Sequence, residues 1–286
     1  MIKTLINYLK MTKLPVTGLV LMTTAAGFFL AGGSIIPSSR FIYLMLGAGL
    51  SCSGSAVLNQ YLERDLDAKM SHSRNRPLPA GEIIPLRAFN FGVILVLLGV
   101  VWLYLTVNLL TAFLSLVTAF IYIIVYTPMK RASWLNTSIG AIAGALPPVG
   151  GWAAASGNIS GGAWFLFSIL FIWQHTHFYA ICWMLRQDYR SAGMKMLSAI
   201  EPQGRRTFKH ILLHSLLLVP VSVLPFWSGI SGRVYYFGAL SLGIALVVFS
   251  LKLFFSGSDE DTRLLFKASV AYLPALILLI VADSVF

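Results

Sequence analysis

Long runs of apolar residues recur along the whole chain and alternate with shorter polar or charged segments. A transmembrane helix needs about 20 apolar residues, because its backbone groups must bond to one another in lipid. The pattern predicts nine such helices, over residues 15–36, 41–60, 87–107, 109–127, 136–155, 162–184, 210–228, 233–255 and 264–284. We therefore expect an all-α membrane protein with a single domain over residues 1–286.

The composition agrees with this class. Apolar residues make up 57% of the 286 residues and charged residues only 11%, whereas soluble domains carry about 25% charged residues. So few charges would leave a soluble protein with large exposed apolar patches, which cause aggregation. The composition therefore excludes an ordinary soluble domain, a disordered chain and a disulfide scaffold.

The distribution of positive charge predicts the orientation in the membrane. With the N-terminus in the cytoplasm, all of the 21 Lys and Arg residues except Arg40 and Arg233 fall in cytoplasmic segments. Lys and Arg are enriched in cytoplasmic loops, so this asymmetry favours an odd number of spans and a C-terminus on the outer side. Residues 1–13 indicate a short amphipathic helix on the inner leaflet. The absence of a targeting extension favours a bacterial inner (cytoplasmic) membrane.

Nine of the ten acidic residues fall on the predicted cytoplasmic side, and six of these lie in two loops, 61–86 and 185–209. Around the first loop, Asn59, Glu63 and Asp67 follow one another at intervals of four, so on a helix they share one face. Three oxygen ligands on one face suit Mg²⁺, whose coordination shell is usually completed by substrate phosphates. Arg74 and Arg76 follow closely, and guanidinium groups bind phosphate through paired hydrogen bonds. The alternative is a solvated loop whose charges only keep it out of the bilayer.

These residues and several other segments resemble the UbiA superfamily of intramembrane prenyltransferases, and within it the heme O synthase branch (protoheme IX farnesyltransferases). The branch pattern N-x3-D/E-x3-D, followed by M-x-R-T-x-x-R-P-L, is matched at Asn59, Glu63, Asp67, Met70, Arg76, Pro77 and Leu78. His72 and Ser73 depart from it, because Arg and Thr are usual there. Further segments match in the same order, at residues 9–15, 126–131, 136–152, 173–178, 188–197 and 204–207.

The resemblance implies a helical bundle around a central cavity that opens to the cytoplasmic side. It also implies transfer of the farnesyl group of farnesyl diphosphate to the vinyl group of heme B, with addition of water. The products would be heme O, for terminal oxidase biogenesis, and diphosphate. Mg²⁺ would be the cofactor and heme B a substrate. Heme A synthase or terminal-oxidase assembly proteins are the implied protein partners, in the lipid bilayer and without nucleic acid.

The resemblance further implies roles for individual residues. Asp188 would join Asn59, Glu63 and Asp67 in catalysis and metal binding. Four cations would hold the diphosphate, namely Arg74, Arg76, Lys130 and Arg131, and two residues would hold the heme, namely His177 and Lys195. Simpler alternatives stay open, because inner-face cations anchor membrane helices, loop carboxylates pair with neighbouring Arg, and a histidine in a span can be structural.

Two other functions also stay open. A UbiA-type prenyltransferase acting on an aromatic or quinone precursor would be expected to carry D-x3-D in the second loop, where this chain has Asp188 and then Ala192. A membrane transporter would be expected to place charges near the bilayer midplane. Here the carboxylates gather at one predicted face instead, which favours the transferase.

Overall fold

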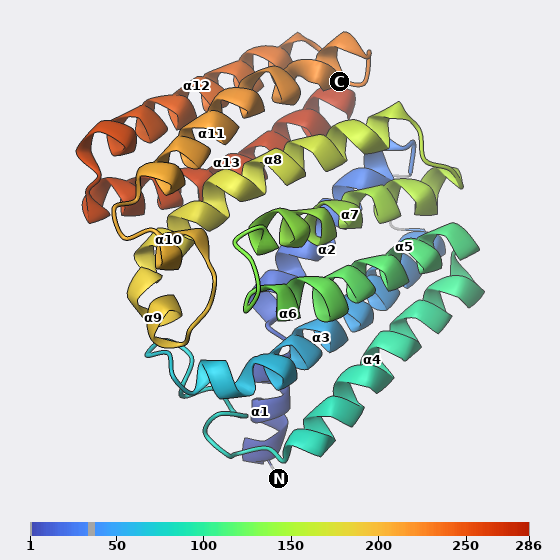
Figure 1. Ribbon diagram of the computed structural model, residues 1–286. Helices are drawn as coiled ribbons and strands as arrows, with labels where there is room; N and C mark the ends of the chain where they lie inside the picture. Colours follow the sequence, from blue (N-terminus) through green and yellow to red (C-terminus); the bar gives the residue numbers. More distant parts are fainter. Residues whose placement is uncertain (1, 34–37, 286) are drawn as a thin grey trace.

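The computed structural model describes residues 2–33 and 38–285, and every regular element in these residues is a helix (Figure 1). Each range predicted to span the membrane overlaps a long helix, although residues 34–36 of the first range lie outside the described residues. The long helices are α2 (Leu14–Leu30), α3 (Ser39–Asp67), α4 (Pro85–Thr106), α5 (Leu109–Phe120), α7 (Asn136–Ser156), α8 (Gly161–Met184), α11 (Arg205–Trp227), α12 (Arg233–Ser256) and α13 (Asp259–Val285).

Shorter elements complete the fold. The π-helix η1 (Ile121–Tyr126) and the single turn α6 (Thr127–Met129) continue α5 as one rod. The second charged segment forms α9 (Arg186–Ser191) and α10 (Leu197–Ile200). The N-terminal helix α1 (Ile2–Met11) meets α2 at a bend of 47°. At this bend Lys13 takes a left-handed conformation with φ +49°, which is uncommon for a residue with a side chain.

Side chains and turn residues explain several of the helix ends. Ser38 accepts a hydrogen bond from the backbone N–H of Phe41 and so caps α3, and Asn108 caps α5 through the N–H of Thr111. Such caps satisfy amides that have no partner within the helix. The first predicted loop begins later than expected, because α3 continues to Asp67. The helical residues 61–67 are mostly good helix formers, and this extension places Glu63 on the same helix as Asn59.

By length and composition, seven helices of the described residues can cross a membrane, and the bent pair α1–α2 raises this count to eight. The prediction of nine spans is therefore not confirmed. Helix α7 does not qualify, because small residues and the interior prolines Pro147 and Pro148 replace large apolar side chains. It lies against α2, α5 and α8, so most of its surface faces protein rather than lipid.

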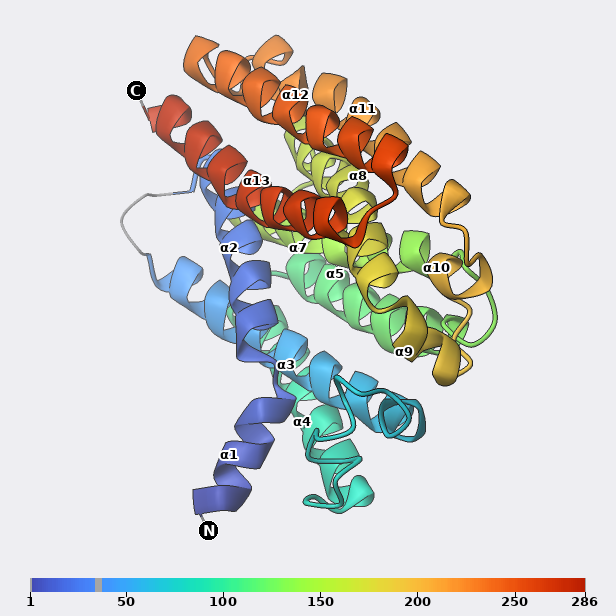
Figure 2. The ribbon, with the colours of Figure 1, turned by 90° about the vertical axis from the view of Figure 1, so that its left-hand side faces the viewer.

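Helices α2 and α7 connect two halves of the bundle (Figure 2). One half contains α3, α4 and α5, and the other contains α8, α11, α12 and α13 around a shared apolar core. At the crossing of α2 and α7, a Cβ on Gly27 would lie 2.0 Å from Pro148 O, and one on Gly151 would lie 1.9 Å from Thr24 O. Only glycine permits so close an approach of two backbones.

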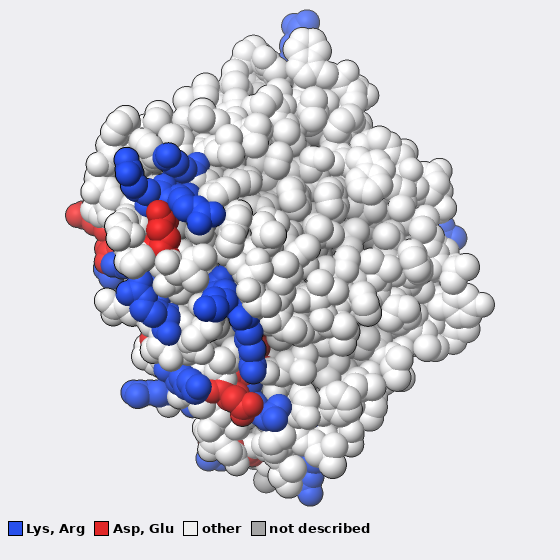
Figure 3. All heavy atoms as spheres, viewed as in Figure 1, with Lys and Arg blue, Asp and Glu red and all other residues white. Residues whose placement is uncertain are grey.

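Successive long helices run in alternating directions, so the charged segments meet at one end of the bundle. Figure 3 shows Lys and Arg side chains gathered along this side, while most of the visible face is uncharged. The two chain ends lie at opposite ends of the bundle (Figure 1). This arrangement agrees with the charge asymmetry of the sequence, whereas the assignment of this end to the cytoplasm stays a prediction.

Candidate active site

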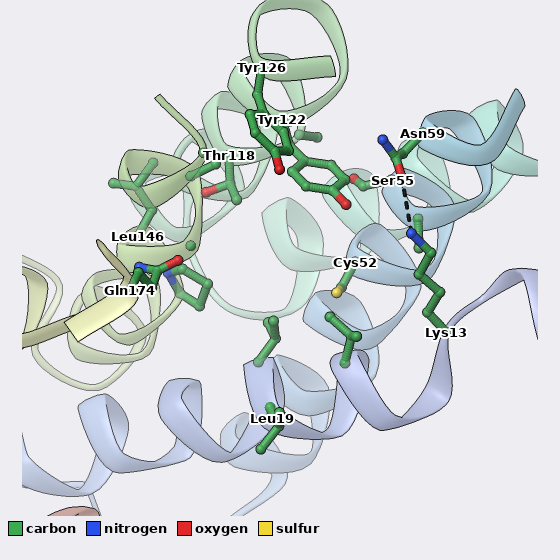
Figure 4. A pocket seen from close by; sticks show the side chains of 18 of the residues that line it. Lys13, Leu19, Cys52, Ser55, Asn59, Thr118, Tyr122, Tyr126, Leu146 and Gln174 are labelled. Atoms are coloured by element: carbon green, nitrogen blue, oxygen red, sulfur yellow. Dashed lines mark hydrogen bonds between the residues drawn. The ribbon is translucent and has the colours of Figure 1, made fainter. Parts of the chain in front are cut away.

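A cavity of about 500 Å³ lies among α2, α3, the α5–η1 rod, α7 and α8 (Figure 4). Most of its wall is apolar, with contributions from Leu19, Leu114 and Leu146. The wall becomes charged near the ends of α3 and α6, where all five Lys, Arg, Asp and Glu side chains of the lining lie, namely Lys13, Glu63, Asp67, Arg76 and Lys130. The cavity therefore combines an apolar chamber with a charged end.

Asn59, Glu63 and Asp67 all line this charged end from the last turns of α3. Only 1%, 4% and 1% of their respective surfaces are exposed. The common face that the spacing predicts is therefore present. Burying charged groups is costly unless each finds a partner, so the surroundings of the three side chains decide what they can bind.

Each of the two carboxylates is paired with a cation from a different segment. Arg76 Nη1 donates to both oxygens of Asp67, at 2.9 and 2.8 Å. Lys130 Nζ lies 2.7 Å from Glu63 Oε1, although this contact lacks hydrogen-bond geometry. Glu63 Oε1 is in consequence a buried oxygen without a hydrogen-bond partner among the described residues. Burial opposes the charge on Lys130, yet Glu63 and Tyr126 hold the pKa of its amine well above the usual value.

Asn59 is held from two sides. Its Oδ1 accepts a hydrogen bond from Lys13 Nζ at 3.0 Å, which Figure 4 shows as a dashed line. Its Nδ2 donates to Thr127 Oγ1 at 3.1 Å. Lys13 comes from the α1–α2 bend, and Gln60 fixes that bend to α3 by donating to Met11 O at 2.8 Å. The charged end is thus assembled from the N-terminal segment, α3, the segment after α3 and the end of α6.

Two tyrosine side chains, Tyr122 and Tyr126, project from η1 toward the cavity (Figure 4). Their ring centroids lie 5.5 Å apart, and Lys130 Nζ lies 4.6 Å from the centre of the Tyr126 ring. The π-helix that carries them has a local cause. Pro128 has no backbone N–H and so cannot continue the α-helical hydrogen bonds, and the N–H of Thr127 bonds to Tyr122 O, five residues earlier. Single π-turns of this kind are frequent at functional sites.

His177 lines the cavity from α8, with its ring stacked on Trp173 at a centroid distance of 4.9 Å. Its Nδ1 lies 2.9 Å from Ser269 Oγ. Ser269 Oγ donates its only proton to Phe266 O at 2.7 Å, so it must accept from His177 Nδ1–H. This inferred tautomer leaves Nε2 with a free electron pair, as a metal ligand or a hydrogen-bond acceptor requires.

Three further cations predicted to bind substrate lie elsewhere. Arg74 is exposed and does not line the cavity. Arg131 is also exposed and donates to Leu62 O at 3.3 Å. Lys195 is exposed and outside the lining, although its backbone N–H donates to Lys130 O at 2.7 Å. Of the implied diphosphate ligands, the structure therefore brings only Arg76 and Lys130 to the cavity.

The structure does not bring Asp188 together with Asn59, Glu63 and Asp67. The carboxylate of Asp188 accepts from Ser71 Oγ at 2.9 Å and lies 2.6 Å from His72 Nδ1. The hydrogen bonds from His72 and Ser71 lower the pKa of Asp188 to about 2. No three His, Cys, Asp or Glu side chains form a metal-binding group within residues 2–33 and 38–285.

The contacts of Asp188 therefore form a latch, by which we mean the group Ser71, His72 and Asp188. The latch ties the segment after α3 to α9. His72 occupies the position where the resembling branch has Arg, and here its ring serves the latch. Arg76 belongs to the segment that the latch holds in place, and it contacts Asp67. The latch therefore also helps to position the charged end of the cavity.

A second hollow of about 330 Å³ adjoins the charged end. Its lining among the described residues holds no carboxylate. It consists of Pro77 and of basic and amide side chains, namely Lys10, Lys13, Gln60, His72, Asn75 and Arg76. Lys13, His72 and Arg76 line both spaces. The hollow is therefore an electropositive antechamber to the cavity.

Comparison with known proteins now adds the family. Residues 20–273 match the UbiA prenyltransferase family. The chain belongs to the UbiA prenyltransferase family. Relatives of this UbiA protein include the protoheme IX farnesyltransferase of Solibacter usitatus, 41% identical over 97% of this chain and 98% of that protein. That of Koribacter versatilis is 38% identical over 97% and 93%, and that of Aquifex aeolicus is 36% identical over 98% and 95%.

Solved structures show that the fold is of the UbiA type. A digeranylgeranylglyceryl phosphate synthase structure has a TM-score of 0.83 at 16% identity, covering 99% of both chains. A UbiA homologue from Aeropyrum pernix has a TM-score of 0.73 at 17% identity, covering 92% of this chain and 98% of that one. A UbiA homologue from Archaeoglobus fulgidus, bound to GPP and Mg²⁺, has a TM-score of 0.70 at 17% identity, covering 96% and 99%.

The sequence prediction missed several residues of this UbiA site. Lys13 was assigned to an interfacial helix, but it reaches Asn59. A signal was present, because Lys13 is a cation directly before the first apolar run and belongs to the segment 9–15, which resembles the N-terminal segment of the family. Tyr126 and Thr127 lie in the segment 126–131 that resembles the family, but the resemblance gave them no role. Tyr122 gave no separate signal, since aromatic residues at the end of an apolar run are also typical of a membrane interface.

Proposed function

We propose that this UbiA-family protein transfers the farnesyl group of farnesyl diphosphate to the vinyl group of heme B, with addition of water, and so produces heme O. The observation that supports transfer of a prenyl group is the cavity itself. It is an apolar chamber with a buried carboxylate face and three cations at one end. The choice of acceptor is supported by relatives named protoheme IX farnesyltransferase that match nearly the whole chain.

The residues of the charged end fit Mg²⁺. Asn59, Glu63 and Asp67 each offer oxygen ligands, which Mg²⁺ prefers. Glu63 Oε1 has an ion pair with Lys130 but no hydrogen bond among the described residues. We infer that these three side chains hold the ion. When bound, Mg²⁺ would neutralise the diphosphate and make it a better leaving group. The Archaeoglobus fulgidus homologue solved with GPP and Mg²⁺ supports this proposal through its fold.

The cations have a second task in this proposal. Lys13, Arg76 and Lys130 contact the α3 face, and they would also meet the oxygens of a diphosphate bound beside it. Positive groups held in place before the reaction stabilise charge that develops on a leaving group. We assign no substrate contact to Arg74, Arg131 or Lys195, and we assign Asp188 to the latch.

The remaining wall suits the prenyl chain and the cation formed from it. As the C–O bond breaks, diphosphate leaves with the electron pair and an allylic cation remains. Such a cation requires a chamber poor in water, and the faces of Tyr122 and Tyr126 stabilise positive charge. The vinyl π electrons of heme B then form the new C–C bond. The resulting cation adds water and releases a proton, which completes the hydroxyl group.

We infer that heme B enters from the α8 side of the cavity, where His177 lies. The free electron pair on His177 Nε2 suits an iron ligand. The oxidation state of the iron would not change, because heme is the substrate and the reaction alters only its vinyl group. The protein would act in the inner membrane with its charged end in the cytoplasm, where the water-soluble diphosphate can be released.

Mass spectrometry of hemes tests the proposal. The purified protein, supplied with heme B, farnesyl diphosphate and Mg²⁺, is expected to form a heme heavier by one farnesyl group and one hydroxyl group. The Asp67→Asn variant is the control and should form none. Unchanged heme B with a folded wild-type protein would contradict the proposal. A prenylated aromatic or quinone precursor, formed in its place from a membrane extract, would favour the other class of acceptor.

A further inference from the structure

Thr127 stands at the junction of η1 and α6, directly opposite Asn59 of α3. Both side chains are buried, with exposed fractions of 3% and 1%. Thr127 Oγ1 takes part in two hydrogen bonds, one with Asn59 Nδ2 at 3.1 Å and one with Tyr122 O at 2.8 Å. The hydroxyl thus connects the π-helix to the amide at the charged end of the cavity.

The direction of these bonds follows from counting protons. A threonine hydroxyl has one proton, and the backbone oxygen of Tyr122 can only accept it. Thr127 Oγ1 must therefore accept from Asn59, which turns the NH₂ group of the amide toward Thr127. The amide oxygen then faces the opposite way, toward Lys13 Nζ, which can only donate. Both neighbours select the same orientation of the amide.

A reversed amide would be strongly disfavoured. It would aim an NH₂ group at the Lys13 ammonium and place two donors where an oxygen ligand is needed. It would also leave Thr127 Oγ1 facing an oxygen without a proton between them. The π-turn contributes to this selection, because it brings the Thr127 hydroxyl and the Thr127 N–H to the same Tyr122 oxygen.

We propose that Thr127 is a positioning residue that fixes the Asn59 amide with its oxygen toward Lys13, at the charged end of the cavity, and so sets the affinity for a Mg²⁺–prenyl diphosphate complex. This inference rests on the proposed function, because it assumes that Asn59 contributes an oxygen to that complex. Residues that orient a metal ligand from behind commonly alter metal affinity or activity by about 10- to 100-fold when replaced.

Binding measured without heme tests this role apart from turnover. Farnesyl diphosphate is titrated into the purified protein with Mg²⁺, by isothermal calorimetry. Thr127→Val keeps the side-chain shape but removes the acceptor, and it should weaken binding by about 10- to 100-fold. Thr127→Ser restores the acceptor and should bind like the wild type. Thr262→Val is the matched control, because Thr262 is buried and donates to Ser258 O, just before α13 and outside the cavity lining; it should bind normally.

An Asn59→Asp background separates positioning from a general structural effect. An aspartate presents oxygen on both sides, so its orientation no longer matters, and adding Thr127→Val should change the affinity only within about twofold. Wild-type affinity in Thr127→Val, or an equal loss in both backgrounds, would overturn the inference. A wild-type protein that binds no farnesyl diphosphate would instead contradict the proposed function, so the two failures can be told apart.

Discussion

Lys130 shows at the scale of single residues how stability and function are joined in this cavity. Its ammonium is the charged partner of the buried Glu63 carboxylate, and in the proposed function it also faces the diphosphate. Removing one member of a buried ion pair leaves the other uncompensated and costs about 3–5 kcal/mol, whereas replacing both members is nearly neutral. Stability and catalysis should therefore respond differently to single and paired substitutions.

Lys130→Gln is expected to lower the unfolding temperature in detergent and to reduce heme O formation by about 100-fold, the usual cost of losing one preorganised charge-stabilising group. The paired Glu63→Gln/Lys130→Gln variant should recover most of the unfolding temperature and stay inactive. Asp65→Asn is the control, since Asp65 lies on α3 with its side chain 71% exposed and beside Arg64. Recovery of activity in the paired variant would contradict the proposed role of Lys130.

At this scale the sequence predicted part of the site. Spacing alone put Asn59, Glu63 and Asp67 on one face, because helical periodicity is a local property. It did not predict Lys13 as their neighbour, because that contact depends on the left-handed bend before α2. The family resemblance, and not the spacing, implied that Asp188 binds the metal, whereas in the structure His72 and Ser71 bind its carboxylate. Contacts between segments far apart in the chain leave no periodic signal.

At the scale of elements, the latch links the segment after α3 to α9 and so restrains the position of Arg76. Asp188→Asn should weaken the latch while the long helices stay packed. In this variant, backbone hydrogen exchange in residues 68–84 is expected to rise. The affinity for farnesyl diphosphate should fall as well, because Arg76 is then held less firmly. Ser71→Ala should give a smaller change of the same kind, because it removes only one of the donors.

Glu260→Gln serves as the control for this experiment, because Glu260 is exposed on α13. The alternative role for Asp188, that of a metal ligand, predicts a different result. In that case Asp188→Asn would abolish activity without any change in hydrogen exchange over residues 68–84. The two readouts together therefore assign Asp188 to the latch or to the metal.

The elements themselves were predictable to different degrees. Long apolar runs predicted the positions of the long helices, because a helix satisfies all of its backbone hydrogen bonds within one segment, as lipid requires. The π-turn at Ile121–Tyr126 and the short helices α9 and α10 had no such signal. Their geometry depends on Pro128 and on contacts with other loops, which a periodicity of 3.6 residues does not report.

At the scale of the whole molecule, charge separates the two ends of the bundle (Figure 3). The sequence predicted this asymmetry from the loops alone, although it overstated how apolar α7 would be. The antechamber lies at the charged end and shares Lys13 and Arg76 with the cavity. In the proposed function, the released diphosphate would pass through it on the way to water.

Lys10 gives this route a test, because it lines the antechamber and not the main cavity. Lys10→Gln should weaken product inhibition by inorganic diphosphate by at most about fivefold, since exposed ion pairs contribute about 0.2–1 kcal/mol. The KM for farnesyl diphosphate should change less. Lys209→Gln, an exposed lysine of α11, is the control. Equal inhibition of all three proteins would exclude the antechamber from the path of release.

The crossing of α2 and α7 limits how this enzyme can be redesigned. Gly27 and Gly151 leave no space for even a methyl group between the two backbones, so neither helix can move or gain bulk independently. An engineer who wants the chamber to accept a wider substrate would instead shorten side chains that line the wall away from this crossing, such as Trp173, Phe178 and Ile181 of α8. Attempts to widen the chamber by substitution at the crossing would separate the two halves of the bundle.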